Sequence, residues 1–202
     1  MPRRSLTRSG NPVPHPRYGS APIASGLKIP EDEIRRGFWR HGRDELFPET
    51  VLRANTDKQN FAVFPRQYYV DVLRTCRTCH RPFIFFAREQ RYWFETLRFF
   101  VDADCVLCPV CRRDSRTVQR RLRRYSDLLP KANPTSKDLM LLVDDAAFLL
   151  EHGALRNLSS VGALKNRALR VIPEYPGLEQ LKKILAASRE ARSAASQETH
   201  PR

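Results

Sequence analysis

Hydrophobic and polar positions divide the chain into a stretch without a period, a strand-rich centre and a helical end. Residues 1–30 contain six prolines and three glycines among polar residues, with neither a helical nor a strand period. Such a segment buries too little apolar surface to offset its conformational entropy. We therefore predict a disordered N-terminal arm.

Apolar residues become frequent from residue 31 onward, but only the first of them follow a helical spacing. Ile34, Phe38 and Trp39 come after three acidic residues, which predicts a short helix. Residues 43–70 are interpreted as irregular chain that wraps the following module and enlarges its small core. The alternative is that their aromatic side chains form an exposed platform on which nucleic-acid bases stack.

The centre of the chain predicts a β-hairpin and a helix. Apolar runs lead into and out of a turn at 76–79, as in two antiparallel strands. Residues 87–97 have a helix-forming composition with apolar side chains along one flank. The expected unit is a small hairpin-and-helix module.

Two Cys-x2-Cys pairs frame this module, C-R-T-C at 76–79 and C-P-V-C at 108–111. Each tight turn can present two sulfurs to one ion, and four thiolates are the ligands of tetrahedral structural zinc sites. The predicted ligands of one structural Zn²⁺ per chain are Cys76, Cys79, Cys108 and Cys111. Four protein ligands leave no position for water, so we expect the ion to stabilise the fold without catalysing a reaction.

Cys105 extends the second pair to C-x2-C-x2-C, a run that also occurs in iron–sulfur proteins. An iron–sulfur cluster and a redox role for Cys105 therefore stay open as alternatives. We favour zinc, because a cluster on this run leaves the first pair half unused, and we interpret Cys105 as a small buried apolar residue. His80 adjoins Cys79 and is interpreted as a bystander, because it can reach the ion only by straining the turn.

The run from C-R-T-C-H-R-P-F-I-F-F-A-R-E-Q through R-Y-W-F-E to C-P-V-C-R-R, at about 68–113, resembles the probable zinc-ribbon domain family of bacterial proteins. That family has a Cys-x2-Cys knuckle, an aromatic strand, a Glu-Gln pair, an aromatic-rich helix and a second Cys-x2-Cys-Arg. The resemblance implies that the four paired cysteines are the ligands and that Glu89 and Gln90 lie at the start of the helix. His80 departs from the family, which often has glycine there, and Cys105 falls where the family has no ligand. No established activity comes with the resemblance.

A basic helix is predicted after the second cysteine pair. Its apolar positions recur at steps of four, three and four, as on one face of a helix. They are Val118, Leu122, Tyr125 and Leu129. Seven arginines and one acid stand between 112 and 124, and arginine forks match phosphate oxygens. The candidate nucleic-acid ligands are Arg112, Arg113, Arg116, Arg120, Arg121, Arg123 and Arg124.

The rest of the chain predicts a helical hairpin and one further helix. Thr135 and Asp138 fit a capping box, and apolar residues at helical spacing then continue to Gly153. The same spacing recurs in 160–171 and after Pro176. These helices offer a surface on which a protein partner can dock.

The predicted fold class is α+β, a four-cysteine zinc-ribbon or treble-clef-like module followed by a basic helix and a C-terminal helical hairpin. The predicted segments are a disordered basic arm (1–30), the zinc module with its N-terminal wrap (31–113), a basic helix (114–131), a C-terminal helical region (132–187) and a frayed tail (188–202).

Charge is distributed unevenly along the chain. The net charge is +14, and most of it lies in residues 1–30, with five basic groups and no acid, and in residues 112–131, with eight basic groups and two acids. This segregation favours a zinc-binding protein that contacts the backbone of RNA or DNA. The alternative is a protein-interaction adaptor that uses the C-terminal helices.

Other classes of function are not expected. No apolar run approaches the roughly 20 residues that cross a bilayer, so no membrane partner is predicted and the expected location is the cytoplasm. The five histidines are scattered, and the chain has neither a nucleophile elbow nor a glycine-rich phosphate loop. We therefore expect neither an enzymatic activity nor a small-molecule substrate.

Overall fold

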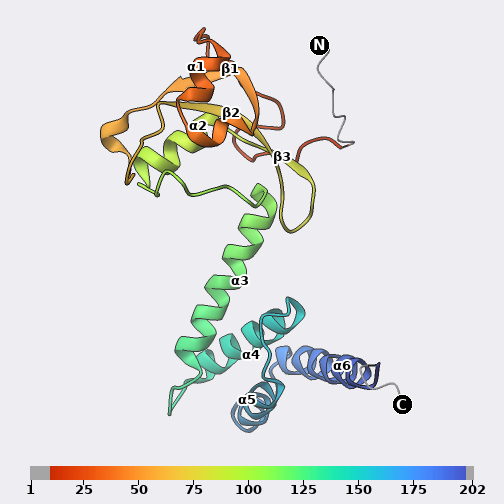
Figure 1. Ribbon diagram of the computed structural model, residues 1–202. Coiled ribbons are helices and arrows are strands. Elements are labelled where there is room, and N and C mark those ends of the chain that lie inside the picture. The colour runs from red at the N-terminus through yellow and green to blue at the C-terminus, as the bar shows by residue number, and fades with distance from the viewer. Residues whose placement is uncertain (1–9, 199–202) are drawn as a thin grey trace. The chain divides into compact units, whose positions relative to one another are not determined.

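The computed structural model describes residues 10–198 and confirms the predicted mixture of helices and strands. The chain divides into two compact units, Met1–Arg113 and Asp114–Arg202, and each has a buried core of its own. The sheet and the short helices belong to the first unit, whereas the described part of the second unit is helical (Figure 1).

The sheet of the first unit has three antiparallel strands in the order β1, β2, β3. Their bounds are Glu45–Arg53 for β1, Tyr68–Thr75 for β2 and Pro82–Phe85 for β3. The first five residues of the central strand are all buried, which explains why it is apolar at successive positions, apart from Asp71, rather than at alternate ones. The β2–β3 pair is the predicted hairpin.

Strand β1 corrects the interpretation of residues 43–70 as irregular chain. Its pairing with β2 changes register between Phe47 and Leu52, a stretch that contains Pro48. A proline and a register shift interrupt the two-residue alternation by which a strand is recognised. Pairing with the buried β2 is what makes this segment a strand.

Short helical segments accompany the sheet. They are α1 Glu31–Arg36, the 3-10 turns η1 Trp39–Gly42 and η2 Thr56–Lys58, the helix α2 Ala87–Arg91 and the π-helical turn η3 Tyr92–Thr96. The helices predicted after residue 31 and over 87–97 are therefore present, although the second changes from α to π geometry midway.

Residues 10–30 differ from the prediction of a disordered arm. The side chain of Val13 is 3% exposed and packs with Phe83, and its backbone N–H donates to the Pro82 carbonyl at 2.8 Å. The edge strand β3 has backbone groups free to bond this segment, and further contacts such as the Ser25 N–H with the Glu49 carbonyl, at 2.9 Å, also hold the proline-rich chain. Residues 1–9 of the predicted arm lie outside the described residues.

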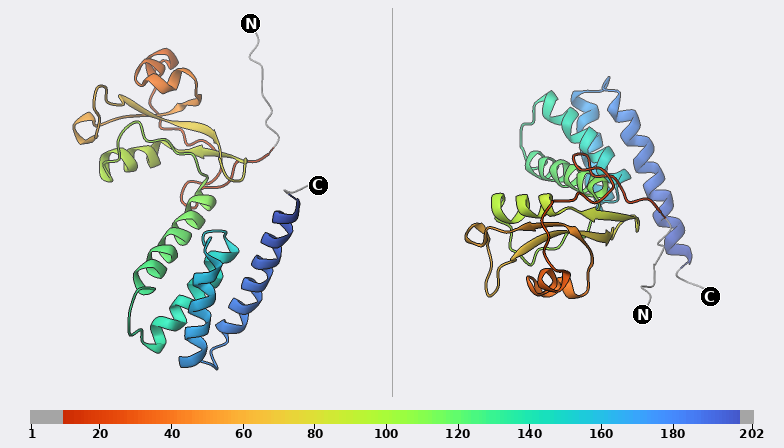
Figure 2. Two further views of the ribbon diagram at one scale, coloured as in Figure 1. Left: turned by 60° about the horizontal axis from the view of Figure 1, so that its bottom comes forward. Right: turned by 90° about the horizontal axis from the view of Figure 1, so that it is seen from above.

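The second unit is a helical bundle. Its helices are α4 Ser136–Glu151, α5 Leu158–Val171 and α6 Gly177–Glu198, packed side by side (Figure 2), and the helix α3 Pro109–Leu128 enters it from the first unit. Apolar side chains of all four helices meet in one core. The predicted capping box is confirmed, since Thr135 accepts from the Asp138 N–H and Asp138 from the Thr135 N–H.

Residues 188–198 of the predicted frayed tail belong instead to α6, which continues through Glu198, and residues 199–202 lie outside the described residues. None of the helices within residues 10–198 is long and apolar enough to cross a membrane.

His41 gives the first unit a pH-dependent stability. Its side chain is 1% exposed, and its Nδ1 lies 3.2 Å from the Ile34 carbonyl oxygen. Burial lowers the pKa of His41 to about 4, against an ordinary value of 6.5, so the folded protein keeps the imidazole neutral. The unfolded chain binds a proton below about pH 6.5, which the folded chain does not bind until about pH 4. Stability contributed by the neutral imidazole is therefore lost as the pH falls through this window.

We expect replacement of His41 by leucine to remove this dependence. Between pH 7.5 and pH 5 the unfolding free energy of the wild type should fall by about 2 kcal/mol more than that of the variant, at roughly 1.4 kcal/mol per pH unit below 6.5. Denaturant titrations of metal-loaded protein at both pH values measure the difference. His152→Gln, at an exposed histidine, is the matched control and should keep the wild-type dependence. If the unfolding free energies of the wild type and of H41L change equally between pH 7.5 and pH 5, the pH dependence does not come from His41.

Candidate metal centre and arginine helix

The first cysteine pair lies in the turn between β2 and β3. The Cys76 N–H donates to the Arg81 carbonyl, and the His80 N–H donates to the Cys76 carbonyl, each at 3.0 Å. The Arg77 N–H donates across to the Val106 carbonyl at 2.8 Å. Backbone bonds therefore fix the turn and tie it to the chain that carries the second pair.

His80 closes this turn in a left-handed conformation, with φ at 57°. Glycine adopts that conformation without the steric cost that a Cβ atom brings. This explains why the resembled family often has glycine here. The exposed His80 side chain is absent from the cluster of possible metal ligands, in line with its interpretation as a bystander.

The second cysteine pair begins α3. Cys108 directly precedes the helix, Pro109 is its first residue and Cys111 lies in its first turn. Proline suits the first helical position because its missing N–H has no helical acceptor there. The Cys111 N–H points to the Cys108 sulfur at 3.5 Å. The positive end of the helix dipole thus faces the sulfurs and favours their thiolate form.

Together these two turns form a four-sulfur cluster. The Sγ atoms of Cys76, Cys79, Cys108 and Cys111 all lie within 4.8 Å of one another. The Sγ atoms of Cys79 and Cys108 are 3.8 Å apart, about the edge of a tetrahedron with zinc–sulfur bonds of roughly 2.3 Å. Cys76 and Cys108 are buried, whereas Cys79 is exposed. The donor set and its spacing fit a tetrahedral metal ion.

Electrostatics at the cluster favour a bound cation. Burial opposes ionisation of Cys76, but N–H groups of Cys108, Cys79 and Thr78 bond its sulfur and lower its pKa to about 6. Burial raises the pKa values of Cys108 and Cys111, which also lie against the neighbouring sulfurs. Four adjacent sulfurs cannot all become thiolates without a positive charge between them, and a divalent metal supplies it.

Cys105 stands apart from this cluster. Its side chain is buried, its sulfur lies 3.6 Å from the Leu107 carbonyl oxygen, and it packs in the same core cluster as Phe83 and Phe85. Burial raises its pKa to about 12, so it stays a neutral thiol. These observations agree with its interpretation as a small apolar residue.

A buried ion pair joins the hairpin side of the site to α3. Glu89, in α2, accepts a hydrogen bond of 2.7 Å from Arg112, the residue after the last cysteine, and their side chains are 9% and 14% exposed. The Arg112 guanidinium lies 5.2 Å from the Trp93 ring centroid, and His15 Nε2 lies 3.6 Å from Glu89. The Glu of the Glu-Gln pair and the Arg of Cys-x2-Cys-Arg are thus direct partners.

Gln90 connects α2 to the sheet. Its Nε2 donates to the carbonyls of Val70 and Phe85, at 2.6 and 2.9 Å, and its side chain is fully buried. Two adjacent residues, Glu89 and Gln90, therefore fix α2 to α3 and to both hairpin strands.

Sequence reasoning missed one supporting residue, Asp71. Its carboxylate accepts from the N–H of Ala87, at 2.6 Å, and from the N–H of Ile23, at 3.0 Å. It therefore caps α2 and holds the N-terminal segment, while burial raises its pKa and these two bonds oppose the rise. The available signal was an acid within the apolar strand Y-Y-V-D-V-L, since a buried charge needs partners.

A hairpin that carries one cysteine pair and a helix N-terminus that carries the other define a treble-clef metal site. Residues 70–120 match the sequence model of a family described as "Probable treble clef domain". This match confirms the resemblance and places a treble-clef domain in this part of the chain. Neither the comparison with curated proteins nor that with solved structures found a match.

The structure divides the seven candidate arginines into two groups. Arg112 pairs with Glu89, whereas Arg121 and Arg124 both contact the buried carboxylate of Asp145, at 3.3 and 2.6 Å. Arg113 also has an interaction within the protein. Arg112, Arg121 and Arg124 therefore hold α3 to neighbouring elements.

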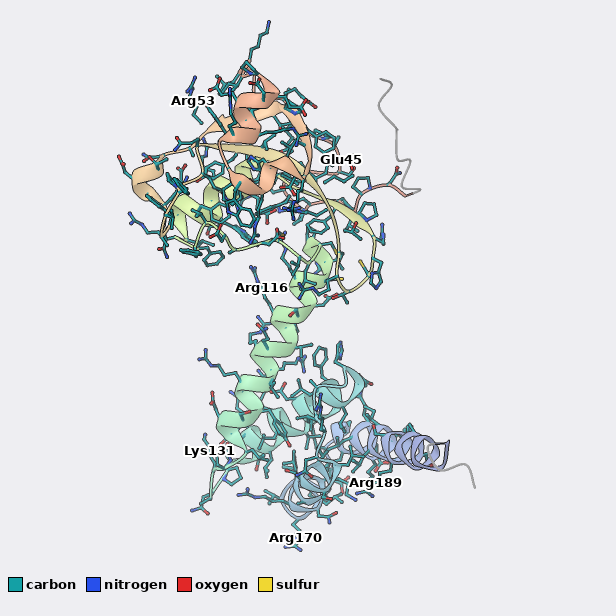
Figure 3. The ribbon with its side chains drawn as sticks, viewed as in Figure 1. Glu45, Arg53, Arg116, Lys131, Arg170 and Arg189 are labelled. Carbon is teal, nitrogen blue, oxygen red and sulfur yellow. The ribbon has the colours of Figure 1, made fainter. Side chains whose placement is uncertain are left out.

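Arg116, Arg120 and Arg123 form the second group, which we call the arginine stripe. All three are exposed, and among the described residues none of them has an ion-pair or hydrogen-bond partner. Their steps of four and three place them along one face of α3, where Arg116 is labelled in Figure 3. The opposite face carries Val118, Leu122 and Tyr125, which pack into the helical core.

Proposed function

We propose that this protein is a non-enzymatic nucleic-acid-binding protein with one structural zinc ion in its treble-clef domain. The arginine stripe contacts phosphate groups of RNA or DNA. The observation that supports this most directly is that three exposed arginines follow one face of a helix whose other arginines are engaged, and that these three have no partner within residues 10–198.

Zinc is the metal that best suits the four-sulfur cluster. Thiolates select soft or borderline ions, and a tetrahedral set of four sulfurs is typical of structural zinc. The arrangement leaves no ligand position for a substrate or a reactive water molecule. A purely structural role follows, in which the ion joins the hairpin to α3.

The geometry of the stripe suits a phosphate backbone. Arg116 and Arg123 are seven residues apart, which corresponds to about 10 Å along a helix. Their guanidinium groups are free to form paired hydrogen bonds with phosphate oxygens, and each such contact releases counterions. Asp127, one turn beyond Arg123, is an exposed acid on the same face and bounds the stripe.

Replacing Arg116, Arg120 and Arg123 together by glutamine is expected to weaken binding to a mixed-sequence DNA duplex by roughly tenfold or more. The slope of log K against log salt concentration should decrease in magnitude by about 2 to 3, because three phosphate contacts are lost. Fluorescence anisotropy over a salt series measures both quantities.

The matched control removes the same charge elsewhere on the second unit. Lys137, Arg156 and Arg170 are exposed and lie outside α3, and their joint replacement by glutamine should leave affinity and slope close to the wild type. If the two triple variants weaken binding equally, only net charge matters and the stripe is not the binding surface.

The adaptor alternative has less support from the helices themselves. Among the described side chains of the second unit, one large apolar group, Val171, is exposed, and nearly all the others pack into the shared core. Absence of nucleic-acid binding by the wild type, together with a partner that requires α4 to α6 and survives nuclease treatment, would favour the adaptor.

A further inference from the structure

Four exposed phenylalanines lie on two adjoining segments of the first unit. Asn60 and Phe100 form a parallel bridge, in which the Val101 N–H donates to the Asn60 carbonyl at 2.9 Å. The Asn60 side chain also contacts the Arg98 carbonyl, at 3.4 Å. The members of this phenylalanine patch are Phe61, Phe64, Phe99 and Phe100, which are 39%, 73%, 40% and 41% exposed.

The loop that carries Phe61 and Phe64 is held firmly at its base. The Gln59 amide accepts from the Arg66 N–H at 2.8 Å and donates to the Arg66 carbonyl at 2.9 Å, which closes the loop between these residues. The buried Arg66 guanidinium lies between the rings of Phe38 and Phe94, 3.9 and 4.2 Å from their centroids. The buried Arg66 side chain and its bonds with Gln59 therefore fix the base of the loop. The fold itself holds the rings of Phe61 and Phe64 at the surface.

The second segment turns outward through two unusual backbone conformations. The π-helical turn η3 ends where the Leu97 N–H donates to the Tyr92 carbonyl, and Arg98 follows with φ at 53°. A non-glycine residue in the left-handed region and a π-turn both carry a conformational cost, and such features concentrate at functional sites. Here they place Arg98 and the two phenylalanines after it at the surface.

Positively charged side chains lie beside the phenylalanine patch, whereas most of the nearby carboxylates already accept hydrogen bonds. Lys58 and Arg98 are exposed and, within residues 10–198, have no ion-pair partner. Glu95 accepts from the Asn55 N–H, and Asp102 accepts from Trp39 Nε1; Asp57 is an exposed acid. Lys58 belongs to the region of the patch, because η2 packs against η3.

We propose that the phenylalanine patch binds single-stranded nucleic acid by stacking unpaired bases, with Arg98 and Lys58 contacting the adjoining phosphates. Aromatic rings stack on the face of any base, and a duplex keeps those faces covered. The flanking positive charge and the net charge of +14 fit a polyanion. This inference rests on the proposed function, to which it adds a preference for unpaired strands.

The test measures the binding of three probes to the wild type, to the arginine-stripe variant and to two further variants. The probes are an oligothymidine of about 15 nucleotides, an abasic strand of equal length and a duplex of equal length. The variants are Phe61→Ser with Phe64→Ser, and a control, Leu27→Ser with Val171→Ser, at exposed apolar residues outside the patch. Zinc content and far-ultraviolet circular dichroism show that each variant is folded.

We expect wild-type protein to bind oligothymidine more tightly than the abasic strand or the duplex. The patch variant should lose about a hundredfold in affinity for oligothymidine, at roughly tenfold for each stacking ring, and keep its duplex affinity and salt slope. The control variant should match the wild type on all three probes.

Each other outcome has a defined meaning. If the patch variant binds oligothymidine as the wild type does while the arginine-stripe variant loses affinity, the stacking site is overturned and the proposed function stands. Equal losses on oligothymidine, abasic strand and duplex also overturn it, because base faces then play no part. If the wild type binds none of the probes, both proposals fail.

Discussion

Removal of the metal ion is expected to unfold the first unit and to leave α4, α5 and α6 helical. The cysteines are themselves core residues of the first unit, since Cys76 and Cys108 pack with Phe83 and Phe85 in one small cluster. Structural zinc sites contribute on the order of 10–16 kcal/mol to folding. Loss of the ion removes more free energy than the roughly 5–15 kcal/mol by which a typical domain is stable.

The second unit does not share this dependence. Its core contains only residues beyond the cysteine pairs, from Tyr125 to Leu185 among those that are buried. Its helices have 16, 14 and 22 residues, whereas α1 and α2 of the first unit have 6 and 5. Most of the helical circular-dichroism signal therefore belongs to elements that have a core of their own.

Chelation of metal-loaded full-length protein tests this expectation. Release of one zinc ion per chain should accompany loss of near-ultraviolet circular dichroism and rapid proteolysis before residue 109, while most of the far-ultraviolet signal persists. Cys76→Ser and Cys108→Ser should reproduce this state without chelator. Cys105→Ser is the matched control and should retain the metal, because Cys105 is outside the cluster.

Three results would contradict the assignment of a structural zinc ion to the four-cysteine cluster. An intact first unit after metal removal would show that the ion does not hold the fold. Metal loss from Cys105→Ser, or iron with a brown visible absorption band, would bring Cys105 into the site and favour an iron–sulfur cluster.

Breaking the Glu89–Arg112 pair is expected to give the second largest effect. Each single variant, Glu89→Gln or Arg112→Gln, leaves a buried charge without its partner, which costs about 3–5 kcal/mol. His15, 3.6 Å from Glu89, does not replace Arg112, because burial lowers the pKa of its imidazole and favours the neutral form. The effect should appear as a lower unfolding free energy of the first unit.

A double-mutant cycle separates this pairing from the packing of the two side chains. The variant that carries both substitutions should be less destabilised than the sum of the single variants, because two amides replace an ion pair without leaving a bare charge. Arg88→Gln, at an exposed neighbour in α2, is the control and should change stability by less than about 0.5 kcal/mol. Single variants that each cost less than about 1 kcal/mol would show that the pair does not hold α2 to α3.

The sequence predicted those parts of the fold whose cause is local. The spacing of the cysteines, the apolar runs on both sides of Cys76, and Thr135 with Asp138 each specify a turn, a strand pair or a helix start from residues close in the chain. The hairpin and the capping box are present as predicted, and the predicted helices are present with different bounds, as in α3, which begins at Pro109 instead of residue 114.

The sequence did not predict the elements that depend on partners far away in the chain. Strand β1 contains a proline and a register shift, and it is a strand because β2 is beside it. The segment that contains Val13 is held by the edge of β3, and Asp71 is a structural residue because Ala87 and Ile23 supply two N–H groups. None of these partners is adjacent in sequence.

The arginines show the same division for the candidate binding surface. Sequence periodicity identified a basic amphipathic helix, because a step of 3.6 residues is a property of the chain alone. Asp145 and Glu89 then decide which arginines are engaged, and both come from other elements. The sequence by itself identified the four cysteines that the structure brings together and the helix that bears the positive charge. The tertiary structure decided which charges stay free and which aromatic rings stay exposed, because both depend on packing between segments far apart in the chain.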